Sequence, residues 1–309
     1  MTEVSRRGFL WAGAALGAIA LAGCAPTGIP VVRLGCGEAG GSYLQFGELL
    51  REAAGVEVGI TALATQGSVE NLALLGDQEI DLALSLADAA AEAPGHDAFV
   101  AIGRVYQNYL QCVVRADDGP RSLPELAGRV VSLGAPGSGA AATARRVLDA
   151  AGLGPGDRGP VTVERSFRDA VADLEQGRID ALFWSGGIPT PQIADLAERT
   201  PIAVLDITAV LPELRRRSPD AYVSTMIPAG VYGASAPVPA IGVANLLVAR
   251  ADLDDLVVER LVDVLIDDAA ALVPPGALGI QYLTPASLID TLPLALHPAA
   301  ERRYRQRYG

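Results

Sequence analysis

The sequence predicts an α/β protein of two lobes, with mainly parallel sheets, flanking helices and a hinge between the lobes. Short apolar runs alternate with segments whose apolar residues recur three and four positions apart. This alternation favours parallel strands, because each helix carries the chain back across the sheet before the next strand begins. A polar break at 116–120 and a later return segment divide the chain into one lobe of 31–116 plus 240–309 and a second of 117–239.

The first lobe is expected to contain three strand–helix units and a longer strand. We predict its strands at 31–34, 56–62, 81–85 and 109–115, and its helices at 42–53, at 68–75 and in the Ala-rich segment that follows. In the second lobe we predict strands at 129–133, 161–164, 179–184 and 202–207, and helices at 138–151, 166–177 and 190–198. The chain returns to the first lobe near 231–248, so we place the hinge crossings near 116–119 and 231–241.

The first residues indicate export and lipidation. Ser5-Arg6-Arg7-Gly8-Phe9-Leu10 matches the twin-arginine pattern, and the uncharged run 10–23 is shorter than the about 20 apolar residues that span a bilayer. Leu21-Ala22-Gly23-Cys24 resembles a lipoprotein signal-peptidase site. We therefore predict a twin-arginine lipoprotein signal at 1–23, lipid on Cys24, a linker at 24–30 and attachment to the outer face of the cytoplasmic membrane. The alternative is a cytosolic chain with an apolar first helix.

Composition narrows the classes of function. The 309 residues carry a net charge of −12, which argues against nucleic acid or anionic membrane surfaces as partners. All 24 basic residues are Arg, so no P-loop lysine or Schiff-base lysine is available. Beyond Cys24, Cys36 and Cys112 either form a disulfide outside the cell or remain as two buried thiols.

One glycine-rich loop follows the first predicted strand and begins a helix. Gly35, Gly37 and Gly40 satisfy the G-x-G-x-x-G spacing of dinucleotide-binding proteins. We reject that interpretation, since the motif alone is weak and an exported chain has little access to NAD; no cofactor is expected. The loop is still suited to bind an anionic ligand, because glycines allow close approach of a ligand and the amides at a helix start favour anions.

Two further loops have the same character, at 65–71 and 134–140. Each leads into a helix with a serine at or near its start. In an open parallel sheet, ligands lie beyond the carboxyl ends of the strands. We therefore expect two loops of the first lobe to face one loop of the second across a cleft.

These loops resemble the signature loops of the TAXI family, the solute receptors of tripartite ATP-independent periplasmic (TRAP) transporters. The similar segments include Gly37–Tyr43, Gln66–Leu72 and Gly134–Gly139. Similarity continues in family order at 177–183, 187–189, 227–232 and 296–300, so it covers nearly the whole mature chain. The resemblance implies a type II periplasmic-binding-protein-like fold that captures a small carboxylate-bearing solute, an amino acid such as glutamate or an organic acid, and delivers it to a fused membrane permease.

The resemblance and the loop chemistry together imply a set of ligand-binding residues. They are Gly40, Gly41, Ser42, Tyr43, Ser68, Asn71, Ser85, Asp88, Tyr106, Ser138, Gly139, Ala140 and Gly187. We expect Ser138 and the amides of Gly139 and Ala140 to bind a carboxylate, unless Ser138 is a simple helix cap. Ala140 stands where the family usually has Thr, and Gln107-Asn108 where it has Pro-Glu, which puts the choice of ligand in doubt.

Enzymatic function has little support in the sequence. It contains no H-E-x-x-H, C-x-x-C, G-x-S-x-G or Walker motif, and His96 and His297 are the two imidazoles. His96 is expected in a solvent-exposed loop, and His297 is expected to cap or pack near the end of the chain. We predict neither a catalytic nor a metal site. A solute receptor is favoured over an exported enzyme or a ligand-binding sensor module on the same fold.

Overall fold

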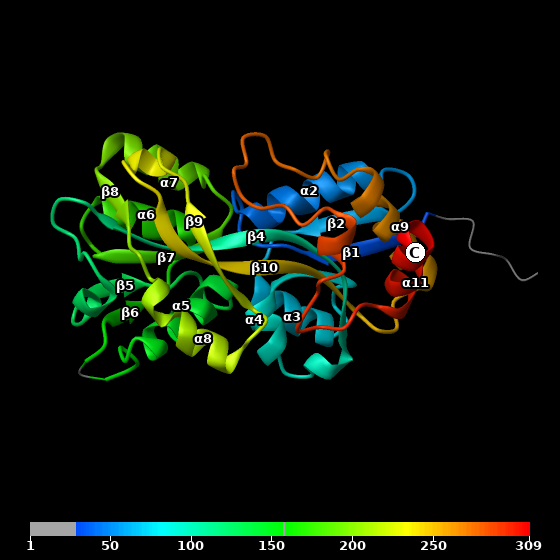
Figure 1. Ribbon diagram of the computed structural model, residues 1–309, viewed down its shortest axis with the longest axis horizontal. Coiled ribbons are helices and arrows are strands. Elements are labelled where there is room, and N and C mark those ends of the chain that lie inside the picture. The colour runs from blue at the N-terminus through cyan, green and yellow to red at the C-terminus, as the bar shows by residue number, and fades with distance from the viewer. Residues whose placement is uncertain (1–28, 157) are drawn as a thin grey trace, which may run out of the picture.

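The computed structural model describes residues 29–156 and 158–309. The expected signal at 1–23, Cys24 and most of the linker therefore lie outside the described residues. Within the described part, none of the helices combines the length and the apolar character that a membrane crossing needs. The two halves of the molecule lie side by side along its long axis, and the C-terminus lies at the outer end of the first (Figure 1).

The strands of the described residues form one mixed sheet in the order β2-β1-β3-β10-β4-β7-β5-β6, with β8 on β4 and β9 on β10. They are β1 (Val31–Gly35), β2 (Gly59–Leu63), β3 (Leu82–Leu86), β4 (Phe99–Arg115), β5 (Val130–Ser132), β6 (Val161–Val163), β7 (Ala181–Gly186), β8 (Ile202–Val204), β9 (Tyr222–Ile227) and β10 (Val238–Arg250). β1 pairs in parallel with β2 and β3, and β5 with β6 and β7, as predicted. β4 and β10 run antiparallel to their neighbours. The predicted two-lobed α/β fold is confirmed, with a sheet that is mixed at its centre.

Two long strands connect the halves. β10 pairs with β3 through Asn245–Ala249 and with β9 through Val238–Val243. β4 pairs with β10 along most of its length and with β7 through Tyr109–Val114. The expected strand at 109–115 was too short, because Gly103, Gln107 and Asn108 interrupt the apolar run although all belong to β4. The exact lobe boundaries and the hinge motion stay predictions.

The helices cover both faces of the sheet (Figure 1). They are α2 (Ser42–Ala54), α3 (Ser68–Gly76), α4 (Ala87–Glu92), α5 (Gly139–Ala150), α6 (Phe167–Glu175), α7 (Pro191–Arg199), α8 (Leu211–Arg217), α9 (Asp255–Asp267), α10 (Pro285–Leu288) and α11 (Pro298–Tyr308). One hydrophobic cluster joins α3 and α4 of the first half to α5 and α8 of the second. On the other face, α2, α9 and α11 share one cluster and α6 and α7 another. The hydrophobic core thus extends across both halves on one face of the sheet, and on the other face each half has its own cluster.

The two described cysteines are free thiols. Cys36 and Cys112 are both buried and belong to hydrophobic clusters on different faces of the sheet. Burial raises the pKa of the Cys36 thiol to about 12, with a smaller opposing effect of the Leu63 backbone, and raises the pKa of Cys112 further above its ordinary value. Of the two alternatives that the sequence left open, the structure has the buried thiols.

Candidate functional site

A cavity of about 40 Å³ lies where the starts of α2, α3 and α5 meet β7. Seven residues predicted from the sequence line it: Gly41, Ser42, Tyr43, Ser68, Ser138, Gly139 and Ala140. The loops of the two halves therefore do face one another across a cleft, as the sequence predicted. About 10–15 Å³ of such volume holds one water molecule, so the cavity has room for about three.

The helix starts approach closely because glycine stands at the contact. A Cβ on Gly139 would lie 2.5 Å from the Ser68 Oγ, nearer than such atoms come to one another. Gly67, which precedes α3, has φ of +116°, a backbone conformation that L side chains rarely adopt. A Cβ there would lie 3.8 Å from the Ser138 Cα. Glycine thus brings α3 of one half and α5 of the other to a common point.

Three helix N-termini present their amides to this cavity. Gly41 is the N-cap residue of α2 and Gly67 that of α3, and neither helix start has a side-chain hydrogen bond to cap it. Ser138 begins α5, and its Oγ accepts a hydrogen bond from Ala141 N at 3.0 Å, which leaves the amides of Gly139 and Ala140 before it. The aligned peptide dipoles of a helix favour an anion at this end.

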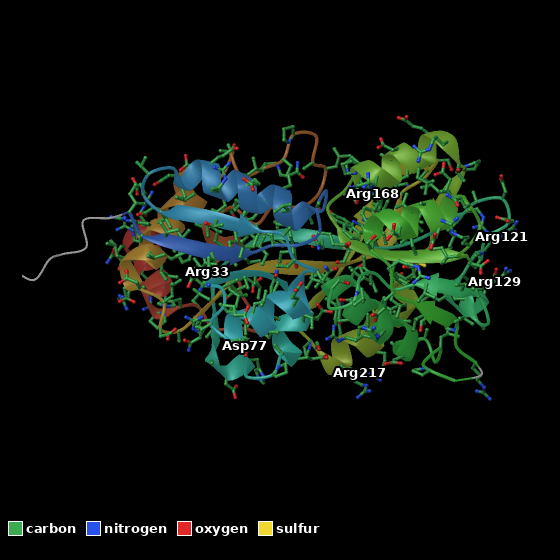
Figure 2. All side chains as sticks on the ribbon, turned by 180° about the vertical axis from the view of Figure 1, so that it is seen from behind. Arg33, Asp77, Arg121, Arg129, Arg168 and Arg217 are labelled. Atoms are coloured by element: carbon green, nitrogen blue, oxygen red, sulfur yellow. The ribbon has the colours of Figure 1, made fainter. Side chains whose placement is uncertain are left out.

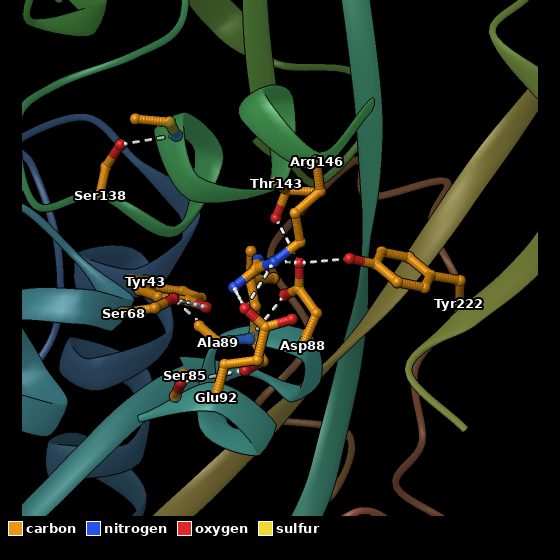
Figure 3. Close-up of polar contacts among 12 residues, drawn as sticks. Tyr43, Ser68, Ser85, Asp88, Ala89, Glu92, Ser138, Thr143, Arg146 and Tyr222 are labelled. Atoms are coloured by element: carbon orange, nitrogen blue, oxygen red, sulfur yellow. Dashed lines mark hydrogen bonds and ion pairs between the residues drawn. The ribbon is translucent and has the colours of Figure 1, made fainter. Parts of the chain in front are cut away.

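The serine side chains that line the cavity all accept hydrogen bonds. The Oγ atoms of Ser42, Ser68, Ser138 and Ser185 accept from the N–H groups of Gly187, Leu86, Ala141 and Asn108, at 3.0, 3.0, 3.0 and 3.3 Å. The Tyr43 hydroxyl also lies 3.0 Å from the Ser68 Oγ (Figure 3). A hydroxyl has one proton to donate, and accepting an N–H leaves that proton for another partner. Ser138 is therefore a helix cap, and this hydrogen bond does not use its hydroxyl proton.

Glu38 brings a negative charge to the wall of the cavity. Its side chain is half-buried, and its Oε1 and Oε2 accept from Phe167 N, at 3.2 and 3.4 Å, at the start of α6 in the other half. Burial raises the pKa of the Glu38 carboxyl, the Phe167 N–H lowers it and the negative charge of Asp169 raises it, with a net increase. Among the residues that the structure describes, no arginine lines this cavity. The arginines labelled in Figure 2 lie at the surface.

Sequence reasoning missed eight residues of the cavity wall: Gly37, Glu38, Gln66, Gly67, Leu86, Asn108, Trp184 and Ser185. Gln66 and Gly67 belong to a loop that it had singled out, and Asn108 to a departure from the family pattern. Trp184 and Ser185 come from β7, whose exposure to the cavity depends on its pairing with β4. The Trp184 ring stacks on Phe167, with centroids 3.7 Å apart, and closes one side.

Four predicted residues border a second cavity of about 200 Å³ beside the first: Gly40, Ser42, Tyr106 and Gly187. Ser42 lines both cavities, and the hydrogen bond that its Oγ accepts from Gly187 N links the halves at the boundary. Proline side chains make much of the second wall, among them Pro189, Pro274 and Pro275.

Three predicted residues line neither cavity: Asn71, Ser85 and Asp88. The Asn71 Nδ2 donates to the backbone carbonyls of Gly35, Cys36 and Leu84, so this side chain holds the first-half loops together. The Ser85 Oγ donates to Leu86 O at 3.0 Å within the core. Both residues are fully buried.

Asp88 joins the two halves instead of facing the cavity. Its fully buried Oδ2 accepts from the Thr143 Oγ1 at 2.6 Å, the Arg146 Nη1 at 2.8 Å and the Tyr222 hydroxyl at 2.9 Å (Figure 3). Arg146 also pairs with Glu92, at 2.7 Å. The network connects α4 of the first half with α5 and β9 of the second. The physical reason for the difference is that a buried carboxylate needs paired donors, and α5 supplies them.

Histidine and metal chemistry are absent from the cavity in the described residues. His96 is exposed, as expected, and His297 caps α11, its Nδ1 accepting from Ala299 N at 3.1 Å. Burial lowers the pKa of His297, opposed by Asp255. Across the described ranges no group of His, Cys, Asp and Glu is arranged to hold a metal ion.

Comparison with solved structures finds chains that align with much of this one. XAC2383 from Xanthomonas citri bound to ATP is 15% identical, with 89% of this chain and 94% of that chain covered and a TM-score of 0.49. The P235GK mutant of ArgBP from T. maritima is 14% identical, over 78% and 91%, with a TM-score of 0.48. The periplasmic aliphatic sulphonate binding protein SsuA from Escherichia coli is 16% identical, over 89% and 78%, with a TM-score of 0.46. At identities this low, the ligand of a similar protein cannot be assigned to this chain. A family model, in contrast, matches residues 34–307, which is most of the chain, and by this match the protein belongs to the NMT1-like family.

Proposed function

We propose that this protein is an extracytoplasmic solute receptor that binds a small carboxylate-bearing solute, an amino acid or an organic acid, between its lobes. It delivers the solute to a TRAP-type membrane permease. The observation that carries the proposal is the convergence of hydrogen-bond donors from both halves on one cavity. Membership of the NMT1-like family and the resemblance of the loops to TAXI receptors support the same function.

The hydrogen-bond donors of the cavity suit a carboxylate, although no arginine lines the cavity in the described part of the chain. The amides of Gly139 and Ala140 and the starts of α2 and α3 supply N–H groups, and the lining serines supply hydroxyl protons. A helix start contributes about 0.3–1 kcal/mol to binding an anion, and up to about 2 kcal/mol in a partly buried site. A hydrogen bond to a charged group adds roughly 1.5–3 kcal/mol. Since each lining serine hydroxyl is oriented by an N–H and not by an imidazole, the arrangement favours binding over nucleophilic catalysis.

The cavity is small, and we propose that the lobes separate to admit a solute. Three hydrogen bonds hold the loop 38–42 of the first half against the second: Glu38 with Phe167 N, Ser42 with Gly187 N, and Gly40 O with the Gln192 Nε2 at 3.2 Å. A typical ligand pocket has about 300–1,000 Å³, far more than the cavity. Binding by closure predicts a smaller radius of gyration in solution scattering when a saturating solute is added. Identical scattering would contradict the hinge.

Attachment to the membrane belongs to the same proposal. The lipid on Cys24 would keep the receptor beside its permease, and the twin-arginine signal would export it. Mass spectrometry of protein extracted from membranes should show diacylated Cys24 as the first residue. A Cys24→Ala protein that stayed membrane-bound and was cleaved at the same bond would contradict the lipid anchor.

Thermal-shift screening of the ligand-free protein tests the binding function. A solute at 100 times its dissociation constant stabilises the folded state by about 2.7 kcal/mol. We expect stabilisation by one or more amino acids or organic acids, and none by neutral sugars or by the methyl esters of the same acids. A panel in which no carboxylate raises the melting temperature, or in which esters act as well as acids, would refute the proposal.

A further inference from the structure

We propose that Glu38 binds the ammonium group of an α-amino acid, so that the receptor selects amino acids over 2-hydroxy acids of the same carbon skeleton. This inference rests on the proposed function, because it concerns the same cavity. It decides between the two solute classes that the proposed function leaves open. Glu38 is a specificity-determining residue in this view.

The first argument is the charge of the cavity wall. In the described part of the chain, Glu38 is the only charged side chain among the residues that line the cavity. The other polar groups of the wall are amides and hydroxyls, which supply donors for a carboxylate. A purely anionic solute would therefore meet a negative charge with no lining cation to offset it. A zwitterion would place its carboxylate at the helix starts and its ammonium at Glu38.

The second argument is the unused hydrogen-bonding capacity of Glu38. An ionised carboxylate has about four acceptor sites, and both oxygens of Glu38 share one donor, Phe167 N. Its half-buried position makes unpaired charge costly, and burial raises the pKa of this carboxyl. An ammonium has three N–H donors and a positive charge, so it satisfies this carboxylate where water is scarce.

A purely structural role for Glu38 is the alternative. Its contact with Phe167 N lies at the start of α6, but that helix already has a cap, since the Ser166 Oγ accepts from Asp169 N at 3.2 Å. If Glu38 served only to close the lobes, its loss would weaken the binding of every solute by the same factor. If it binds the ammonium, its loss would weaken the binding of amino acids alone.

The experiment measures the binding of matched pairs by calorimetry to the intact soluble protein. Each pair is an L-amino acid and the L-2-hydroxy acid of the same skeleton, beginning with alanine and lactate, then glutamate and 2-hydroxyglutarate. The wild-type protein should bind the amino acid at least about tenfold more tightly. Glu38→Gln, which keeps the shape of the side chain, should weaken amino-acid binding about tenfold to a hundredfold, as expected for one hydrogen bond between charged groups. It should not weaken hydroxy-acid binding, because the negative charge that faces an anionic solute is gone.

Gln192→Ala is the matched control. Gln192 also links the halves, through Gly40 O, but it lines neither cavity. This variant should weaken both members of a pair equally. Two outcomes would overturn the ammonium role: equal losses of affinity for both members of a pair in Glu38→Gln, or a wild-type preference for the hydroxy acid. Neither outcome would contradict the proposal that the protein is a receptor for carboxylates. Failure of the wild-type protein to bind either class would refute the proposed function itself.

Discussion

Removal of Arg146 should destabilise the protein more than removal of any exposed arginine on the same helix. Asp88 is fully buried, and Arg146 is the cation that contacts its carboxylate, at 2.8 Å. Loss of one partner from a buried ion pair costs about 3–5 kcal/mol, because the other charge remains buried. Thr143 and Tyr222 still donate to Asp88, so we expect Arg146→Met to cost about 3 kcal/mol, near the lower end of that range. For a chain of this size the melting temperature should fall by about 6 °C.

The assay is chemical and thermal unfolding of the ligand-free protein, followed by circular dichroism. Arg145→Met is the control, since Arg145 is the neighbour in α5 and pairs with Glu164 with its side chain 51% exposed. Exposed pairs contribute about 0–1 kcal/mol. Asp88→Asn combined with Arg146→Met should be more stable than Arg146→Met alone, because the unpaired charge is gone.

Two results would refute this reasoning. The first is a loss of stability in Arg146→Met that is no larger than the loss in Arg145→Met. The second is a double variant, Asp88→Asn with Arg146→Met, that is no more stable than Arg146→Met alone. Either result would show that the buried pair between the halves does not hold them together.

Three further predictions follow from the site and the core. Ser138→Ala should weaken solute binding about tenfold and lower stability by about 1 kcal/mol; a lowered melting temperature with unchanged calorimetric affinity would leave the cap as the sole role. The pKa of Glu38 is raised above 4.5 in the folded protein, so the associated stabilisation is full below pH 4.5 and is lost as the pH rises through the raised pKa. Glu38→Gln should flatten this part of the plot of melting temperature against pH. Identical plots for the wild-type protein and the variant would contradict the assignment of this pH dependence to Glu38. Cys36 and Cys112 should not react with a thiol reagent at neutral pH until denaturant is added, whereas rapid labelling of the native protein would contradict their burial.

The sequence by itself determined the class of fold and three of the loops that line the cavity. Both depend on local patterns: apolar runs form strands, three-and-four spacing forms helices, and glycine or serine begins a helix. The loops before α2, α3 and α5 could be placed together because parallel strands end at the same edge of a sheet. For this reason Ser42, Ser68 and Ser138 were predicted correctly to face a common cleft.

The tertiary structure alone decided which polar side chains face the cleft and which serve the core. Asp88 follows a strand and was predicted to bind the ligand, but its partners Arg146 and Tyr222 lie 58 and 134 positions away in the sequence. Ser185 and Trp184 reach the cavity through the pairing of β7 with β4, and Glu38 meets Phe167 over a separation of 129 residues. No local pattern records such separations. The direction of a polar side chain depends on which distant donors, acceptors and apolar surfaces the folded chain brings to it, and that balance exists only once the lobes are packed.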